Sequence, residues 1–88
     1  MKVAFRSSFI RDLKKIKDRS ILEQVKQAIE DIECAQDLRT VSNIKKLGGG
    51  RKFYRIRIGN YRVGLVVQGG EVEFVRCLHR RDIYRFFP

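Results

Sequence analysis

The chain has 88 residues, of which 20 are Lys or Arg and 10 are Asp or Glu, so its formal net charge is +10. This length predicts one domain over residues 1–88 and leaves no room for a second. An apolar content of 43% excludes a disordered tail, and no apolar run approaches the roughly 20 residues that cross a bilayer.

The chain begins with a predicted short strand and a first helix. Residues 2–6 alternate between polar and apolar side chains well enough to form a strand. Apolar residues then recur at helical spacing from Phe9 to Ile16, which predicts one buried helix face. Ser7 or Ser8 is the predicted cap of this helix.

A second helix is predicted after a connection of about three residues. Ser20 and Glu23 form a capping-box pattern, in which the Ser20 hydroxyl would accept a hydrogen bond from the backbone of Glu23. Apolar residues at helical spacing from Leu22 to Ile32 mark its buried face, and the helical period stops near Cys34. The two helices together predict an antiparallel helical hairpin.

The second half of the chain predicts an antiparallel β-meander. After a transitional stretch with a glycine loop at 48–50, the hydrophobic period becomes two. The predicted strands are 52–58, 61–67 and 71–78, with tight turns at Gly59-Asn60 and Gly69-Gly70. We therefore expect an α+β fold in which the helical hairpin packs on a sheet of four strands, or five, and the chain ends in a short helical turn.

The first tight turn determines which side chains share a face of the sheet. It pairs Arg57 with Arg62 and Arg55 with Gly64, so the three arginines lie on the face opposite the core. Like charges on directly opposed residues repel, and we expect an anion to relieve this repulsion. Gly64 predicts a bare surface beside Arg55, where a ligand can lie close.

The second tight turn extends this register into the last strand. It pairs Arg62 with Cys77 and places His79 on the same face as the arginines. It also places Arg76 on the core face, opposite Val63, where we expect a position near the sheet edge from which the charge reaches water.

The C-terminal run starting at His79 combines apolar and functional candidates. Ile83 and the two phenylalanines that follow are expected to tuck into the core. His79, the only histidine, is a functional candidate together with Arg80 and Tyr84. The four-residue spacing of Arg80 and Tyr84 places them on one side of a helical turn.

The positive charge is concentrated in the second half of the chain. Residues 45–88 hold eleven basic and three acidic side chains, which is typical of a surface that binds a polyanion. A solvated surface and an acidic protein partner are the alternatives. The two cysteines lie far apart, which indicates reduced thiols and a cytoplasmic protein. Two cysteines and one histidine do not fill a structural zinc site, and we expect no metal and no other cofactor.

The residue types fit one chemistry better than others. The sequence suggests no serine triad, no paired carboxylates and no two-metal nuclease site. A cationic cluster with one imidazole and one phenol suits metal-independent RNA cleavage, in which the RNA's own 2′-hydroxyl attacks the adjacent phosphate. Arginines would stabilise the charge that develops on the phosphate, and His79 would transfer a proton near neutral pH. Tyr84 would stack on a base or exchange a proton.

Two runs of sequence carry a resemblance to a known family. The run Tyr-Arg-Ile-Arg-Ile-Gly-Asn-Tyr-Arg-Val at 54–63 is followed after one strand by His-Arg-Arg-Asp-Ile-Tyr at 79–84. Together with Lys-Leu-Gly at 46–48 and the helical hairpin, they resemble the RelE/ParE toxin superfamily, on its RelE-like mRNA-interferase side, over nearly the whole chain. The resemblance implies a toxin of a type II toxin–antitoxin system that cleaves mRNA in the ribosomal A site without a metal. It also implies a small RelB-like antitoxin as partner, besides mRNA and the ribosome, and no membrane.

The resemblance also implies roles for individual residues. By position, Arg55 and Arg57 match the basic residues of the family's strand, Arg62 the arginine on the scissile phosphate, Arg80 the transition-state arginine and Tyr84 the terminal tyrosine. The candidate catalytic residues are Arg57, Arg62, His79, Arg80 and Tyr84, and the candidate RNA-binding residues are Lys45, Lys46, Arg55 and Arg81. Because arginine is a poor general base where relatives often have lysine, proton transfer is assigned first to His79 and second to Tyr84.

Three rival functions stay open at this point. A ParE-like toxin that inhibits DNA gyrase would share the fold and need no nuclease site. A non-catalytic RNA-binding module is the second rival, although the basic face lacks exposed aromatic residues of the kind that stack on bases. A plain interaction domain is the third.

Overall fold

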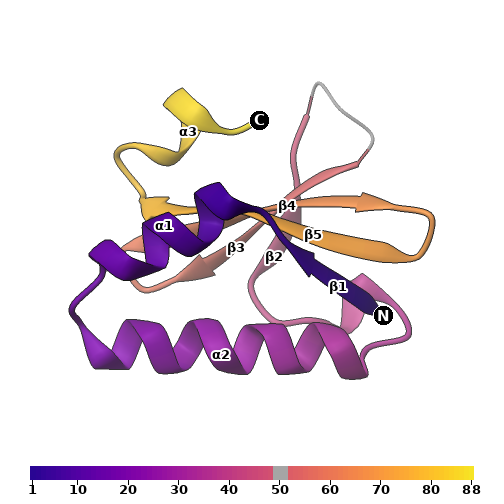
Figure 1. The fold of residues 1–88 in the computed structure, drawn as a ribbon. Helices are drawn as coiled ribbons and strands as arrows, with labels where there is room; N and C mark the ends of the chain where they lie inside the picture. Colours follow the sequence, from indigo (N-terminus) through magenta and orange to yellow (C-terminus); the bar gives the residue numbers. More distant parts are fainter. Residues whose placement is uncertain (49–51) are drawn as a thin grey trace.

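A five-stranded sheet forms the middle layer of the protein, between two helices and the C-terminal segment (Figure 1). This computed structural model describes residues 1–48 and 52–88. The elements are, in chain order, β1 (Lys2–Phe5), α1 (Ser7–Lys15), α2 (Arg19–Cys34), a 3₁₀ turn (Leu38–Thr40), β2 (Ile44–Lys46), β3 (Phe53–Ile58), β4 (Tyr61–Gln68), β5 (Glu71–His79) and α3 (Ile83–Phe86). The strand order is β1-β5-β4-β3-β2, with β1 parallel to β5 and the other pairs antiparallel. The predicted α+β fold is confirmed. The prediction allowed four strands or five, and the described residues form five. Of the predicted glycine loop, Gly49 and Gly50 lie outside the described residues.

The helical hairpin forms as predicted, but its caps are different. The Asp18 carboxylate accepts hydrogen bonds from the backbone of Ser20 and Ile21, so Asp18 is the N-cap of α2. The capping box predicted at Ser20 is therefore wrong, since Ser20 already lies in the first turn. The cap predicted at Ser7 or Ser8 is wrong as well: α1 begins after Arg6 without a side-chain cap, and the Ser8 hydroxyl donates instead to the carbonyl of Val75.

The register between β3 and β4 is confirmed. Gly59 has φ +55, a left-handed conformation that glycine adopts without strain, and it forms the two-residue turn with Asn60. Arg57 pairs with Arg62, and Arg55 pairs with Gly64. The three arginines consequently share one face of the sheet.

The register between β4 and β5 changes part-way along the strands. Leu65 pairs with Phe74 as predicted, but the register shifts between Gly64 and Leu65. Gly64 pairs with Arg76, and the extra residue Val75 forms a β-bulge. A bulge moves every later side chain to the other face, which the sequence pattern did not reveal.

The bulge reverses the predicted faces of the second half of β5. Arg62 pairs with Leu78 rather than Cys77, and Cys77 is buried in the core opposite Val63. Arg76 pairs with Gly64 rather than Val63, so the prediction that it lies on the core face is wrong. Because β1 pairs with β5 only as far as Phe74, Arg76 lies in a part of β5 that β1 does not cover, but its charge does not simply reach water. Its charge is instead matched by a carboxylate of α1, described below.

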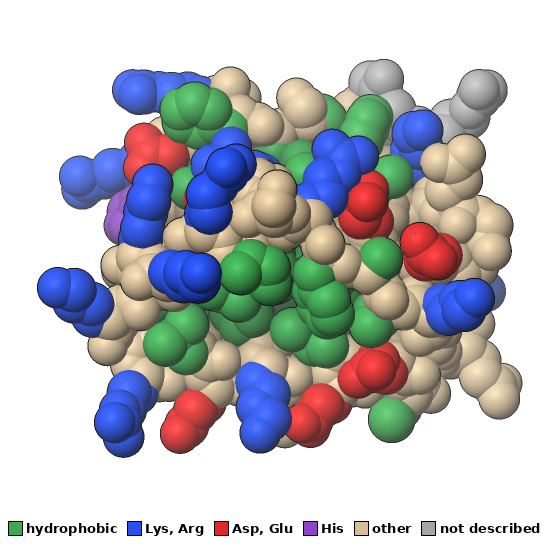
Figure 2. All heavy atoms as spheres, in the orientation of Figure 1, with side chains coloured by type: hydrophobic (Ala, Val, Ile, Leu, Met, Phe, Trp, Pro, Cys, Tyr) green, Lys and Arg blue, Asp and Glu red, His purple; other side chains and the backbone are tan. Residues whose placement is uncertain are grey.

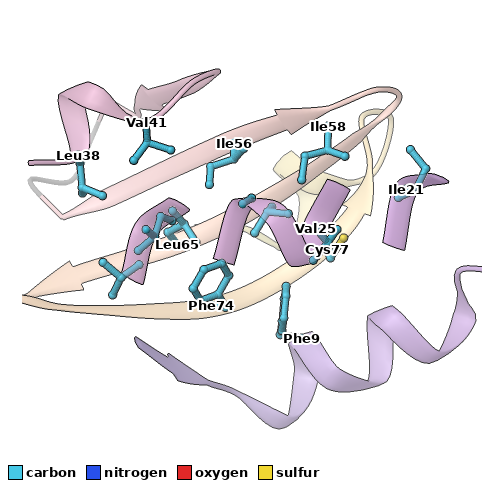
Figure 3. Packing of buried hydrophobic residues seen from close by; sticks show 14 of the residues in the cluster. Phe9, Ile21, Val25, Leu38, Val41, Ile56, Ile58, Leu65, Phe74 and Cys77 are labelled. Atoms are coloured by element: carbon cyan, nitrogen blue, oxygen red, sulfur yellow. The ribbon is translucent and has the colours of Figure 1, made fainter. Parts of the chain in front are cut away.

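The main core lies between the helical hairpin and one face of the sheet (Figure 3). Phe9 of α1 and Ile32 of α2 are fully buried against strand residues such as Leu65 and Phe74. The rings of Phe9 and Phe74 pack at a tilt of 51°, with centroids 5.3 Å apart. Burial of each such side chain stabilises the fold by roughly 1.5–3 kcal/mol. At the surface, apolar side chains gather between α1 and α2, where Leu13, Leu22 and other residues of the two helices line a shallow groove (Figure 2).

A second, smaller core lies on the opposite face of the sheet. Ile83 and Phe87 pack there against Val75, and both are buried. Phe86 stays 56% exposed, so the prediction that it is buried is wrong. The Phe87 ring crosses Gly64, where an added Cβ would lie 2.6 Å from ring atoms. The predicted bare surface at Gly64 is therefore wrong too: the glycine makes room for the protein's own phenylalanine.

Within residues 1–48 and 52–88, no helix has the length and apolar character required to cross a membrane.

Candidate functional site

The candidate site begins with three arginines on the hairpin of β3 and β4. Arg57 and Arg62 are directly opposite each other, and Arg55 lies two residues along β3 on the same face. Arg57 is exposed, whereas Arg55 and Arg62 are half-buried. We call these three residues, together with Arg80, the arginine cluster.

Arg62 lies at the centre of this cluster. Its Nη1 donates to the carbonyls of Gly59 and Tyr61, each at 2.9 Å, so the side chain folds back over the turn. Burial lowers the pKa of Arg62, and the positive charges of Arg55, Arg57 and Arg80 lower it further, whereas Tyr84 raises it. Arginine nevertheless stays charged, because its ordinary pKa is above 12. Arg55, Arg57, Arg80 and Tyr84 are therefore near enough to Arg62 to influence its charge.

Arg55 is held on the β2 side of the cluster. Its Nη1 donates to the carbonyl of Asn43 at 3.3 Å, and Asn43 has φ +64. Its Nε is buried and has no hydrogen-bond partner. A buried donor without a partner is costly, so the position of Arg55 carries an energetic cost.

Arg80 and Tyr84 reach the cluster from the C-terminal segment. The backbone N–H of Arg80 donates to the carbonyl of Asn60 at 2.7 Å, which ties the end of β5 to the hairpin turn. Arg80 lies in the turn before α3 and Tyr84 lies within α3, so the prediction that they share one helical turn is wrong. Tyr84 is 59% exposed and accessible to a ligand.

His79 lies on the other face of the sheet from Arg62. It pairs with Tyr61, and the two rings pack edge to face with centroids 5.7 Å apart. Its Nδ1 accepts a hydrogen bond from the backbone of Arg81 at 3.2 Å. The predicted placement of His79 beside the arginines is wrong, and the cause is the β-bulge at Val75, which inverts the faces of the following residues.

The other predicted RNA-binding residues divide between the faces. Lys45 pairs with Arg55 and extends the arginine-bearing face, whereas Lys46 pairs with Tyr54 on the opposite face. Lys46 and Tyr54 line a cavity of about 580 Å³ beside the 3₁₀ turn. Arg81 is exposed in the turn before α3.

The hairpin turn of Gly59 and Asn60 also acts as a scaffold, a role that no sequence pattern predicted. The carbonyl of Gly59 receives the Arg62 guanidinium, and the carbonyl of Asn60 receives the backbone of Arg80. These contacts use backbone oxygens, which every residue has. No residue type in the sequence could therefore have signalled them.

The arginine cluster has no acidic partner in the part of the chain that the structure describes. The ion pairs found there are Arg6–Glu73, Arg39–Asp37 and Arg76–Asp12, and none involves the cluster. Among the same residues, no three His, Cys, Asp or Glu side chains come together to hold a metal ion. The cluster is therefore a surface of uncompensated guanidinium groups suited to bidentate contacts with phosphate.

Comparison with known proteins identifies the family. A family model described as the ParE toxin of the type II toxin–antitoxin system parDE matches residues 3–84. Toxin RelE3 of Methanocaldococcus jannaschii is 42% identical over 89 residues, covering 100% of both chains. This chain belongs to the RelE/ParE superfamily of toxins.

Solved structures of related toxins have the same fold as this RelE-family toxin. A chain of the RelB–RelE antitoxin–toxin complex from Methanococcus jannaschii is 39% identical, with a TM-score of 0.82 over 97% of this chain and 99% of that one. A chain of the YoeB dimer from Staphylococcus aureus is 17% identical, with a TM-score of 0.74 over 90% of this chain and 95% of that one. At this lower identity the similarity shows the fold alone.

Proposed function

We propose that this toxin is a metal-independent endoribonuclease that cleaves mRNA in the ribosomal A site and so inhibits translation. The observation that carries the proposal is the arginine cluster: Arg55, Arg57 and Arg62 share one face of the sheet, the Arg80 backbone is tied to the adjoining turn, and no ion pair of the described residues involves the cluster. Such a surface suits a transition state that carries more negative charge than the bound RNA.

In the proposed reaction, the 2′-hydroxyl of one nucleotide attacks the adjacent phosphorus. The bond from phosphorus to the 5′-oxygen of the next nucleotide breaks, and a 2′,3′-cyclic phosphate remains. Arg62 and Arg80 stabilise the charge on the phosphorane, while Arg55, Arg57, Lys45 and Arg81 bind flanking phosphates. One proton leaves the 2′-hydroxyl and another joins the 5′-oxygen.

The proposal assigns one of these proton transfers to Tyr84. Tyr84 lies close enough to Arg62 to influence its pKa, whereas His79 is on the other face and its Nδ1 is engaged by the Arg81 backbone. A group that transfers a proton must come within hydrogen-bond reach of the reacting oxygen. We therefore expect Tyr84→Phe to reduce the cleavage rate more than His79→Gln does.

The principal test is the removal of single guanidinium groups. We expect Arg62→Ala and Arg80→Ala each to lower the cleavage rate by about 10²- to 10³-fold, as loss of one charge-stabilising donor does. The measurement is primer-extension mapping of transcripts after induced expression, with purified ribosomes as a second assay. Arg19→Ala, at the start of α2, is the matched control and keeps full activity. Full activity in both Arg62→Ala and Arg80→Ala would remove the basis for this site.

The chemistry has a second, independent test. Cleavage by the 2′-hydroxyl requires no metal, so the slow cleavage of free RNA, measured without the Mg²⁺-dependent ribosome, persists in EDTA and the 5′ fragment ends in a 2′,3′-cyclic phosphate. A rate that EDTA abolishes, or a fragment with a 3′-hydroxyl, contradicts the mechanism. Free RNA is expected to be a poor substrate, because an open surface positions it weakly unless a scaffold such as the ribosome holds it.

We also propose a RelB-like antitoxin as the partner that neutralises the toxin. Support comes from the matched RelB–RelE complex, at 39% identity over nearly all of both chains. Arg62→Ala and Arg80→Ala are expected to retain antitoxin binding, which separates loss of catalysis from loss of the fold.

Inhibition of DNA gyrase is the second candidate function, because the matching family model describes a ParE toxin. It predicts DNA damage and intact transcripts after induction. Cut transcripts with undamaged DNA favour the nuclease. RNA binding without cut transcripts would favour a non-catalytic RNA-binding module.

A further inference from the structure

One carboxylate in the helical hairpin is buried and fully engaged. Asp12 of α1 is only 5% exposed. It accepts hydrogen bonds from Arg76 Nε at 2.8 Å and from Arg76 Nη2 at 3.1 Å, and a third from the backbone N–H of Cys77 at 2.9 Å. A buried charge persists only with such partners, so the site is built around the pair.

Helix α1 uses this carboxylate to hold the β-bulge of β5. β1 pairs with β5 only as far as Phe74, so backbone groups at and beyond the bulge need other partners on that side. The Ser8 hydroxyl donates to the carbonyl of Val75 at 2.6 Å, and Asp12 receives the N–H of Cys77. Ser8 and Asp12 are four residues apart and lie on one face of α1. Together they bind the backbone of Val75 and Cys77, the residues immediately before and after Arg76.

Arg76 then connects the bulge to α3. Its guanidinium carbon lies 5.2 Å from the centre of the Phe86 ring, within the range of a cation–π contact. The bidentate bond to Asp12 fixes the orientation of the guanidinium plane. Phe86 is the most exposed phenylalanine of the described chain at 56%, so burial alone does not account for its position.

We propose that Asp12 and Arg76 are positioning residues that hold α3, through the Phe86 ring, against the sheet face that carries the arginine cluster, and so set the position of Tyr84. Phe86 is two residues from Tyr84 in a helix of only four residues, so the two side chains move together. Phe87 and Ile83 anchor the apolar side of the same segment. The Arg76–Phe86 contact adds a second constraint, which sets the orientation of α3. The catalytic consequence depends on the proposed nuclease function, whereas the order of α3 does not.

Phe86 is the best position for the test, because its substitution leaves no buried charge unpaired. Phe86→Leu removes the ring and keeps an apolar side chain, and Phe86→Tyr restores the ring. Phe5→Leu is the matched control, since Phe5 is another phenylalanine that is 44% exposed. Arg76→Gln made together with Asp12→Asn, which leaves no buried charge unpaired, is combined with Phe86→Leu to complete a double-mutant cycle that measures the coupling of the ion pair to the ring.

The first readout is hydrogen exchange, which needs no enzymatic activity. The amide of Phe87 donates to the carbonyl of Ile83 at 2.8 Å and reports the order of α3. We expect Phe86→Leu to accelerate its exchange by about two- to fivefold, the range of one exposed cation–π contact. Amides within α2 stay unchanged, and Phe86→Tyr restores protection. Unchanged exchange in Phe86→Leu overturns the proposal.

The second readout is the single-turnover rate of RNA cleavage with ribosomes. Phe86→Leu is expected to lower this rate by a similar factor, with RNA affinity unchanged, and Phe86→Tyr to recover it. Faster exchange with an unchanged rate overturns the positioning role. If the wild-type protein cuts no RNA, the proposed function fails, and hydrogen exchange still decides whether Arg76 orders α3.

Discussion

Gly64 shows how a single missing side chain shapes the face that carries the site. The ring of Phe87 occupies the space above this glycine, and the C-terminal segment is therefore pressed onto β4. Leu78 and Phe53 pack against the same small cluster. The glycine thus serves the placement of α3 rather than the approach of a ligand.

Gly64→Ala is expected to destabilise the protein by about 1–3 kcal/mol, the usual cost of overpacking. Its Cβ would lie 2.6 Å from the Phe87 ring, so that ring must move. Thermal unfolding measures the loss. Gly48→Ala is the control, because nothing lies within 4 Å of a Cβ there. Combining Gly64→Ala with Phe87→Ala should recover part of the loss, and strict additivity would mean that the two residues do not clash.

The two cysteines are expected to differ in reactivity. Burial raises the pKa of the Cys77 thiol from 9.0 to about 12, and the negative charge of Asp12 contributes. The folded protein therefore keeps this proton while the unfolded chain loses it above pH 9.0, so this thiol makes stability fall as pH rises from 9.0 to about 12. At about pH 8, iodoacetamide should alkylate only the exposed Cys34, as mass spectrometry of the native protein would show. In urea both thiols react, and modification of native Cys77 would contradict the buried environment.

At the level of elements, α1 and α2 depend on polar contacts that lie outside the hydrophobic pattern. The cap of α2 is Asp18 rather than Ser20, and the polar residues of α1 serve β5 rather than their own helix. The Ser20 hydroxyl accepts a hydrogen bond only from the side-chain amide of Gln24, on the exposed surface. The polar residues that fix each helix, Asp18 for α2 and Ser8 and Asp12 for α1, are therefore identified only by the backbone groups that they bind.

Substitutions at the start of α2 distinguish the observed cap from the predicted one. Asp18→Ala is expected to cost about 1 kcal/mol, because two backbone N–H groups lose their acceptor. For a domain of this size that lowers Tm by about 4–8 °C. Ser20→Ala should change stability by less than about 0.5 kcal/mol. A larger loss in Ser20→Ala than in Asp18→Ala would favour the capping box.

Over the whole molecule, most of the net charge of +10 belongs to residues 45–88, which include the arginine cluster. Acidic residues of α1 and β5 are used in ion pairs with Arg76 and Arg6, away from the arginine cluster. The cluster consequently keeps its charge for a ligand. A cationic surface of this kind attracts RNA with a strong dependence on salt.

The salt dependence of RNA binding tests this arrangement. Each phosphate contact with a single strand contributes about −0.7 to the slope of log K against log salt concentration. Arg57→Ala should reduce the steepness of the slope by about that amount, as measured by fluorescence anisotropy with a short RNA. Lys17→Ala, in the connection between α1 and α2, removes the same charge and should leave the slope unchanged. Equal effects of the two variants would mean that RNA binds through net charge alone.

Most of the fold was predictable, because the signals that define it are short. Helical periodicity from Phe9 onward, the tight turns at Gly59 and Gly69 and the alternation along β3 each involve neighbouring residues. The Arg57–Arg62 pair followed from the turn alone and is confirmed. The faces of the later β5 residues were not predictable, because a bulge of one residue has no clear sequence signal and yet inverts every side chain beyond it.

The linear order of residues was thus enough to establish the helical hairpin, the meander, the shared face of three arginines and the toxin family. Folding alone decided that His79 faces Tyr61 instead of Arg62, and that Arg76 meets Asp12 and Phe86. The physical reason is the separation along the sequence between the residues that interact. Periods and turns act between residues a few positions apart, whereas Asp12 and Arg76 are separated by 64 positions and come together only when α1 packs on β5.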